Sequence, residues 1–274
     1  MNASGSELRL ETLDRADWSV EVRGIHANEP LLSIGSSRAL RTASVAKLFL
    51  LVEVASQFES GQLSPDELLS RDSVARVLDS GLWHRLSTST LPASDIASLV
   101  GAVSDNWGTN VLLQRVGLDA VKARVASLGI VDSVLLDFVR DFRTDDDPET
   151  MSIGTAQEWA RFIADAAIGA VVSHSVSGQL LEWMKANCDH SLVASAFGLD
   201  PLSHWTPDEG VMLWNKTGTD VGVRADVGLV QGVTQLAYAA IVNWDELRHP
   251  GLRPAIMSDL KRIGAWVSER SRQR

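Results

Sequence analysis

The sequence predicts an α/β fold that carries an all-α insert. Three observations support this prediction: strand-like segments lie near the N-terminal end, three more lie near the C-terminal end, and the stretch between them is mostly helical in pattern. The simplest arrangement is one antiparallel sheet with flanking helices, an α/β domain built from both termini by residues 1–62 and 208–274. Residues 63–207 then form an inserted helical domain of ordinary size.

The predicted strands show two kinds of pattern. Residues 17–24 (DWSVEVRG) alternate between apolar and polar side chains, and residues 30–35 can pair with them. The later strands, rich in β-branched and aromatic residues, are expected at 211–218, 224–232 and 234–244. A short Gly/Asp turn separates the first two and a single glycine separates the last two, which favours antiparallel pairing.

The helices are predicted from apolar periodicity and end signals. Residues 46–61 are apolar on most faces and end at Gly61, which predicts a largely buried helix. Ser64 with Pro65 indicates a helix start, and Thr155 with Glu158 indicates a capping box. The other helices are expected at 64–78, 92–104, 109–117, 118–129, 154–169, 177–188 and 252–274.

Composition excludes several classes of protein. The chain has 274 residues and a net charge of -10, whereas a nucleic-acid-binding protein needs a basic face. The six histidines lack metal-ligand spacing, and no glycine-rich phosphate loop occurs. The sequence therefore predicts no metal, no cofactor and no nucleic-acid partner, and we expect a monomer that acts on a small molecule.

The N-terminus and the single cysteine bear on location. The first residues lack a basic start followed by an apolar segment, and no stretch of 18 apolar residues occurs. The chain as printed is thus expected to be cytoplasmic, without membrane contact, or secreted if a signal segment was removed. Cys188 cannot form an intramolecular disulfide, so a free, half-buried thiol is expected.

Three short motifs carry the chemistry. Ser44 and Lys47 stand three residues apart at the start of the helix 46–61, so their side chains can meet on one face. A serine hydroxyl needs a nearby base to act as a nucleophile, and a helix N-terminus favours developing negative charge. A second Ser-x-x-Lys, at Ser258 and Lys261, lies inside the C-terminal helix and is interpreted as surface decoration. Downstream follow Ser104-Asp105-Asn106 between two helices and Lys216-Thr217-Gly218 at the end of a strand.

These motifs, in this order, resemble the class A β-lactamase family and its penicillin-binding relatives. The likeness extends over nearly the whole chain and implies a β-lactamase/transpeptidase-like fold. It implies that Ser44 is the nucleophile and Lys47 its amine, that Lys216 lowers the pKa of Lys47, and that Ser104 passes a proton to the leaving nitrogen. The backbone N–H groups of Ser44 and Thr219 would form an oxyanion hole.

The resemblance also implies a set of substrate contacts. Asn106 would bind a substrate amide, and Thr217, with Gly218 beside it, would bind a substrate carboxylate. Arg224, eight residues after Lys216, matches the family's carboxylate-binding arginine only approximately, because the turn is one residue short. Trp107, Trp205 and Trp214 are candidates for lining a pocket, although tryptophan more often lies in a core or at its rim.

Each of these residues has a plainer interpretation. Ser44 and Ser104 can be simple helix caps, because serine is favoured there. Lys216-Thr217-Gly218 can be a hairpin turn, and Arg224 can be a surface residue of a strand. The three motifs together, each on the expected type of element, favour the catalytic interpretation.

One family element is missing. The family carries a Glu-x-x-Leu-Asn motif on a long loop, and its glutamate activates the water that releases the acyl-enzyme. Residues 133–159 contain no such motif. Glu149 and Asp141 are the candidates to replace that glutamate, and Glu158 lies in the next helix.

The missing glutamate leaves three hypotheses open. The protein is a serine hydrolase that cleaves a β-lactam or related amide, with impaired deacylation; or it is an esterase, peptidase or transacylase acting on another substrate; or it is a non-catalytic penicillin-binding sensor. A positioned base for water is worth roughly 10²–10⁴-fold in rate, so its loss bears most on release of the acyl group.

Overall fold

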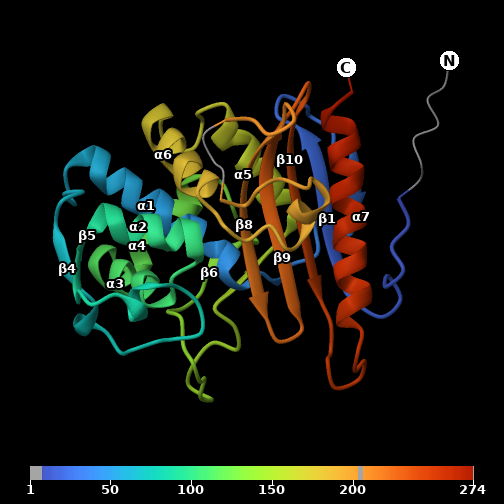
Figure 1. Ribbon diagram of the computed structural model, residues 1–274. Coiled ribbons are helices and arrows are strands. Elements are labelled where there is room, and N and C mark those ends of the chain that lie inside the picture. Colours follow the sequence, from blue (N-terminus) through green and yellow to red (C-terminus); the bar gives the residue numbers. More distant parts are fainter. Residues whose placement is uncertain (1–7, 203–205, 274) are drawn as a thin grey trace.

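The computed structural model describes residues 8–202 and 206–273. A five-stranded antiparallel sheet in the order β2-β1-β10-β9-β8 forms its centre (Figure 1). β1 pairs with β10 from Asp17↔Asn243 to Gly24↔Leu236, so the two ends of the chain build one sheet, as predicted. The strands of this sheet are β1 (Asp17–Gly24), β2 (Leu32–Ile34), β8 (Met212–Asp220), β9 (Val223–Gln231) and β10 (Gln235–Asn243).

Helices cover both faces of this sheet, and α1 runs through the core beside it. In Figure 1, α7 lies along one face and α5 along the other, while α1 to α4 form a helical group at the side of β8. The helices are α1 (Lys47–Ser60), α2 (Ala93–Val103), α3 (Asn106–Val116), α4 (Leu118–Ser127), α5 (Ala156–Ala167), α6 (His174–Lys185) and α7 (Arg253–Ser271). No described helix combines the length and the apolar character needed to cross a bilayer.

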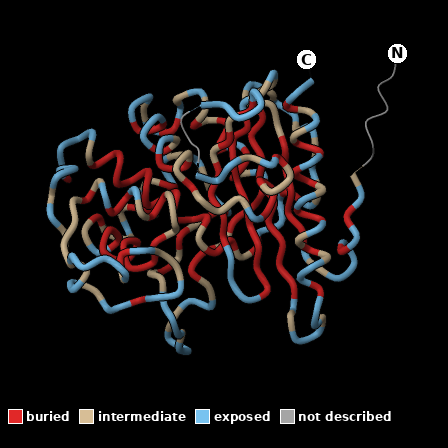
Figure 2. Tube along the Cα trace, in the orientation of Figure 1, coloured by how far each residue is buried: buried red, intermediate tan, exposed pale blue. Residues whose placement is uncertain are grey.

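β10 is buried on both faces, and its side chains divide between two cores. Leu236, Tyr238 and Val242 pack in the cluster under α7, whereas Ala239 and Ile241 pack in the cluster that surrounds α1. This alternation is the period of two that a pleated strand imposes. Figure 2 shows the result as a continuous buried layer through the central strands and α1.

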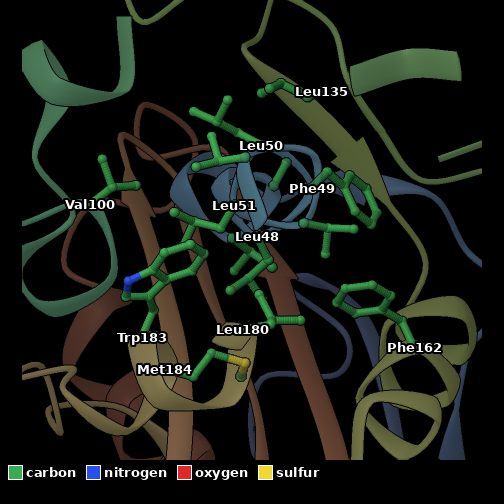
Figure 3. Packing of buried hydrophobic residues seen from close by; sticks show 14 of the residues in the cluster. Leu48, Phe49, Leu50, Leu51, Val100, Leu135, Phe162, Leu180, Trp183 and Met184 are labelled. Carbon is green, nitrogen blue, oxygen red and sulfur yellow. The ribbon is translucent and has the colours of Figure 1, made fainter. Parts of the chain in front are cut away.

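α1 is almost entirely enclosed, as its apolar sequence predicted. Leu48, Leu50 and Leu51 are fully buried, and they point in different directions into packed side chains from α2, α5 and α6 (Figure 3). The helix ends at Gly61, whose φ of 73° is left-handed, in agreement with the predicted stop. Because α1 begins at Lys47, this close packing fixes the position of that lysine.

The predicted helix over 64–78 is wrong. Its residues form β4 (Leu68–Ser70), which pairs with β5 (Thr90–Pro92), and then the 3₁₀ turn η2 (Arg71–Ser73). The side chain of Ser64 accepts a hydrogen bond from Asp66 N, and that of Ser70 accepts one from Asp72 N. Such local bonds offer the backbone an alternative to the helix, and the prediction from Ser64 and Pro65 did not take them into account.

Other departures from the sequence prediction are smaller. α3 starts at Asn106 rather than at residue 109, because Asp105 caps it by accepting from Gly108 N. Three short strands form an unpredicted sheet in the order β3-β7-β6: β3 (Leu40–Arg41), β6 (Val134–Leu135) and β7 (Ser152–Gly154). Segments of two or three residues carry too little pattern to be recognised from sequence.

α5 differs from the prediction at its N-terminal cap and in its packing. Thr155 Oγ1 accepts from Glu158 N as a capping box requires, but the Glu158 carboxylate accepts from Val131 N and Asp132 N instead of Thr155 N. α5 packs against β1 and β10, although it belongs to the range 63–207 that was expected to form the inserted domain. The division of the chain into 1–62 with 208–274 and 63–207 stays a prediction.

Candidate active site

A cavity of about 790 Å³ opens where η1 (Ala43–Ala46), the corner between α2 and α3, and the edge strand β8 meet. Its lining includes five of the predicted site residues: Ser44, Ser104, Asn106, Thr217 and Thr219. The loop 139–151 contributes a further wall. The three sequence motifs are therefore brought together in one hollow.

Ser44 is held in place by a strained turn. The preceding residue, Ala43, has a φ of 47°, which costs a non-glycine residue about 1–3 kcal/mol and persists only where the surroundings enforce it. Ser152 of β7 enforces it here: its Oγ donates to Ala43 O at 2.8 Å and receives a hydrogen bond from Thr42 Oγ1, also at 2.8 Å. Ser152 lies 109 residues from Ala43, and no pattern in the sequence pointed to this contact.

Lys47 is fully buried beneath the cavity. Its Nζ lies 2.7 Å from Ser104 O, 2.7 Å from Asn106 Oδ1 and 3.1 Å from Ser104 Oγ. The first two atoms only accept, whereas a hydroxyl can also donate. Both protonation states of the amine satisfy all three contacts, because Ser104 Oγ can accept an N–H from Nζ or donate to the lone pair of a neutral amine. In the part of the chain that the structure describes, no hydrogen bond joins Nζ directly to Ser44.

The electrostatics of the site favour a neutral Lys47. Burial lowers its pKa well below the usual 10.5, and the nearby positive charge of Lys216 lowers it further, against the opposing effect of Asp105 and Asp79. Lys216 is also fully buried, and burial lowers its pKa to about 8, against the charges of Asp189 and Asp226. The positive charge of Lys216 thus adds to burial in favouring the neutral form of Lys47.

The Ser104-Asp105-Asn106 corner divides its tasks. Ser104 closes α2 in a left-handed conformation, with φ 55°, which turns its hydroxyl towards Lys47. Asp105 is structural: beyond capping α3, its Oδ2 accepts from Leu82 N at 2.7 Å and from Trp83 N at 2.8 Å. Asn106 donates to Leu78 O and accepts from Lys47, so both ends of its amide are engaged in the protein.

Gly218 lets β8 approach the turn that holds Ser44. A Cβ on Gly218 would lie 2.1 Å from Thr42 O and 3.1 Å from Ser44 N, which only glycine avoids. β8 is the edge of the sheet, and alternate residues of such a strand direct their backbone groups away from the neighbouring strand. Thr217 O accepts from Lys216 Nζ on this free side, and Thr219, two residues on, offers its N–H to the same side.

The two side chains predicted to bind a substrate carboxylate, those of Thr217 and Arg224, are hydrogen-bonded to groups of the protein. Thr217 Oγ1 donates to Asp189 Oδ2 at 2.6 Å, so a carboxylate of the protein already occupies this hydroxyl. Arg224 is outside the cavity lining: its Nη1 donates to Asp220 O and Val223 O, and its guanidinium lies over the Trp244 ring. The short turn binds the guanidinium itself, and the contact of Arg224 with substrate stays a prediction.

Asp189 was not among the predicted site residues, and its place just after α6 was the one indication that it could lie near β8. Its neighbour Cys188 is free and half-buried, as expected, and it lines the cavity. Trp107 donates to Arg71 O and Trp214 packs against the core, so neither lines the cavity, while Trp205 lies outside the described residues. Ser258 and Lys261 are exposed on α7, as predicted.

The loop carboxylates differ in their access to Ser44. Asp141 lines the cavity and is exposed, whereas Glu149 is exposed and does not line it. Asp137 is buried and bound by Arg140 and Arg143, which fixes the loop. Among residues 8–202 and 206–273, no group of His, Cys, Asp and Glu is arranged to hold a metal ion.

Solved structures of serine β-lactamases and of PBP-A share this fold. A β-lactamase from Sphaerobacter thermophilus superposes with a TM-score of 0.79 at 22% identity, over 93% of this chain and 92% of that one. PBP-A superposes with a TM-score of 0.77 at 18% identity, over 93% and 90%. A PBP-A mutant, solved as an acyl-enzyme complex with penicillin G, gives 0.75 at 19% identity, again over 93% and 90%.

The fold is thus the β-lactamase/transpeptidase-like fold predicted from the motifs. The sequence model described as "Beta-lactamase enzyme family" matches residues 10–265, and the chain belongs to that family. A comparison with curated protein sequences found no match.

Proposed function

We propose that the protein is a serine acyl-transfer enzyme that opens a β-lactam, or a related amide or ester, by forming an acyl-enzyme at Ser44. The observation that carries the proposal is the buried Lys47, whose Nζ contacts Ser104 Oγ beneath the cavity that Ser44 and Ser104 both line. Burial and Lys216 both favour the neutral amine that a base must be.

The geometry supports an ordered sequence of proton movements. Ser44 Oγ attacks the carbonyl carbon, and its proton passes to the Lys47 amine. The oxygen of the tetrahedral intermediate then accepts from Ser44 N–H and Thr219 N–H. Ser104 Oγ, already in contact with Lys47 Nζ, returns the proton to the leaving nitrogen or oxygen, and the carbon–nitrogen or carbon–oxygen bond breaks.

Release of the acyl group is proposed to be slow. Asp141 is the loop carboxylate that lines the cavity, and it is exposed rather than held by a partner next to Ser44. An exposed carboxylate orders water poorly compared with a base fixed against the ester. The PBP-A mutant with this fold was solved as an acyl-enzyme complex with penicillin G, which supports an acyl group that persists long enough to be observed.

An esterase or transacylase activity is the second candidate, and Asp189 favours it. β-Lactam antibiotics of the penicillin type carry a carboxylate, and Asp189 already accepts the hydrogen of Thr217 Oγ1. A neutral ester avoids that conflict. A purely non-catalytic sensor accounts less well for two buried amines with lowered pKa values, because such shifts cluster where a group takes part in catalysis.

Intact-mass spectrometry after incubation with penicillin G, and separately with p-nitrophenyl acetate, tests the proposal. We expect a covalent adduct with at least one donor in the wild type and none in Ser44→Ala. Ser258→Ala, at an exposed position of α7 in the second Ser-x-x-Lys, is the matched control and should behave as the wild type. No adduct with either donor, under conditions where the protein is folded, would overturn the proposal.

A further inference from the structure

We infer that Asp189 determines substrate specificity at the Thr217 subsite: it turns away substrates that bring a carboxylate to Thr217 and favours substrates that bring a neutral or cationic group. The inference rests on the proposed acylation of Ser44. It concerns the charge of the substrate, which the family membership of the chain does not decide.

The contact between Asp189 and Thr217 carries the first step. Asp189 Oδ2 accepts from Thr217 Oγ1 at 2.6 Å, the length of a strong bond to a charged acceptor. A hydroxyl has a single proton to donate, so Thr217 cannot offer it to a substrate carboxylate at the same time. Two carboxylates competing for that proton would also repel one another.

Asp189 is fixed in this position and ionised. Burial raises its pKa, but hydrogen bonds from Ser191 and Thr217, with the charge of Lys216, outweigh burial and lower the pKa below 3.8. Its Oδ1 accepts from Ser191 N at 3.0 Å, and its backbone carbonyl accepts from the side chains of Asn187 and Asn215. Hydrogen bonds therefore hold both the side chain and the backbone of Asp189, so its carboxylate stays at the Thr217 subsite.

Lys216 does not restore an anion site. Its buried Nζ donates to Thr217 O at 2.9 Å, and Lys216 is not among the residues that line the cavity. Asp189 is the leading opposite charge acting on Lys216. The carboxylate of Asp189 therefore holds the place, opposite Lys216 and on Thr217, that a substrate carboxylate would need.

The arginines near the cavity are also committed to other partners. Arg224 points to its own turn and to Trp244. Arg140 binds Asp137 and Asp147, and Arg143 binds Asp137, although both arginines line the cavity. Each described cation of the cavity lining therefore already has an anionic partner within the protein.

The remaining charges of the lining extend the preference to cations. Asp79, Asp141 and Asp220 line the cavity together with Asp189. With Arg140 and Arg143 balanced by acids outside the subsite, the hollow carries excess negative charge. Such a hollow attracts a positive group and weakens the binding of a negative one.

Three penicillins of matched structure give a direct test. Benzylpenicillin, its methyl ester and its 2-(diethylamino)ethyl ester share one β-lactam and differ in charge at the carboxyl position, which is negative, neutral and positive. The measurement is the second-order rate constant of adduct formation by intact-mass spectrometry. In the wild type we expect the neutral and cationic esters to react at least about tenfold faster than benzylpenicillin.

Asp189→Asn is the key variant, because an amide has the same shape but frees the Thr217 hydroxyl. In this variant we expect the rate constant for benzylpenicillin to rise about tenfold and that for the methyl ester to change by less than about threefold. The cationic ester should then no longer react faster than benzylpenicillin. Asp220→Asn removes a charge from the same cavity without touching Thr217, so it should slow the cationic ester somewhat while the methyl ester still reacts faster than benzylpenicillin, as in the wild type.

The outcomes separate the two proposals. Equal rates for the three penicillins in the wild type, or an unchanged order in Asp189→Asn, would overturn the role of Asp189 while leaving acylation of Ser44 standing. Failure of all three penicillins and of p-nitrophenyl acetate to label the wild type would instead overturn the proposed function. If Asp189→Asn melts below the assay temperature, Asp189→Ser, which also frees Thr217, provides the same comparison.

Discussion

Asn106 Oδ1 lies 2.7 Å from Lys47 Nζ, and both groups are buried. The neutral amide accepts from the amine without adding charge. This lets burial and Lys216 keep the pKa of Lys47 low, whereas a carboxylate at the same place would hold the amine protonated.

Asn106→Asp should therefore shift acylation to higher pH. The new carboxylate raises the pKa of Lys47, so less of the amine is neutral at pH 7, and we expect adduct formation there to fall at least about tenfold. The rate should recover as the pH rises. Asn106→Ser, which adds no charge, is the control: its rate falls without a change in the pH at which the rate begins to rise. An unshifted profile for Asn106→Asp would show that Lys47 is not the titrating base.

Lys216 should produce a fall in the rate of acylation on the alkaline side, near pH 8. Its pKa is lowered to about 8, so its charge, which acts on Lys47 and on the Thr217–Thr219 strand, is lost above that value. Lys216→Arg keeps the charge to higher pH, and the fall should disappear from the range up to about pH 10. A fall that stays near pH 8 in this variant would contradict the assignment to Lys216.

The same pKa shift predicts how stability depends on pH. The folded state binds fewer protons at Lys216 than the unfolded state between pH of about 8 and 10.5. The free energy of unfolding should therefore rise with pH across this window, and Lys216→Met should flatten that rise. Urea unfolding at several pH values measures both slopes.

Gly218→Ala should disable the site while Gly178→Ala should not. A Cβ at Gly218 would lie 2.1 Å from Thr42 O, so β8 or the turn that holds Ser44 must move. A displacement of about 1 Å can cost about a hundredfold in rate. Gly178 lies in α6 with no atom within 4 Å of its Cβ, so alanine there should raise stability by up to about 1 kcal/mol. Adduct formation and thermal unfolding of both variants provide the comparison.

Asp141 and Glu149 should differ in their effect on the lifetime of the acyl-enzyme. Asp141 lines the cavity and Glu149 does not. We expect Asp141→Asn to lengthen the lifetime by about tenfold, less than for a fully positioned base, and Glu149→Gln to leave it unchanged. The decay of the adduct, followed by mass after free substrate is removed, gives both lifetimes. A longer lifetime in Glu149→Gln alone would reverse the assignment.

The elements with strong local patterns and the candidate site residues could be predicted from the sequence. The buried helix α1, the strands of the main sheet and the three motifs follow from periodicity, end signals and residue type over short spans. The placement of Ser44 and Lys47 at a helix start is local in the same sense, because residues three apart share a face.

The groups that the motifs contact depend on segments far apart in the sequence. Ser152 holds the turn at Ala43 from 109 residues away, and Asp189 reaches Thr217 across 28 residues. The tertiary structure also decided that 64–78 forms a strand and turns, because β4 pairs with β5. The physical reason is common to these cases: the contacts join segments that are distant along the chain, and their energy depends on geometry that no local pattern records.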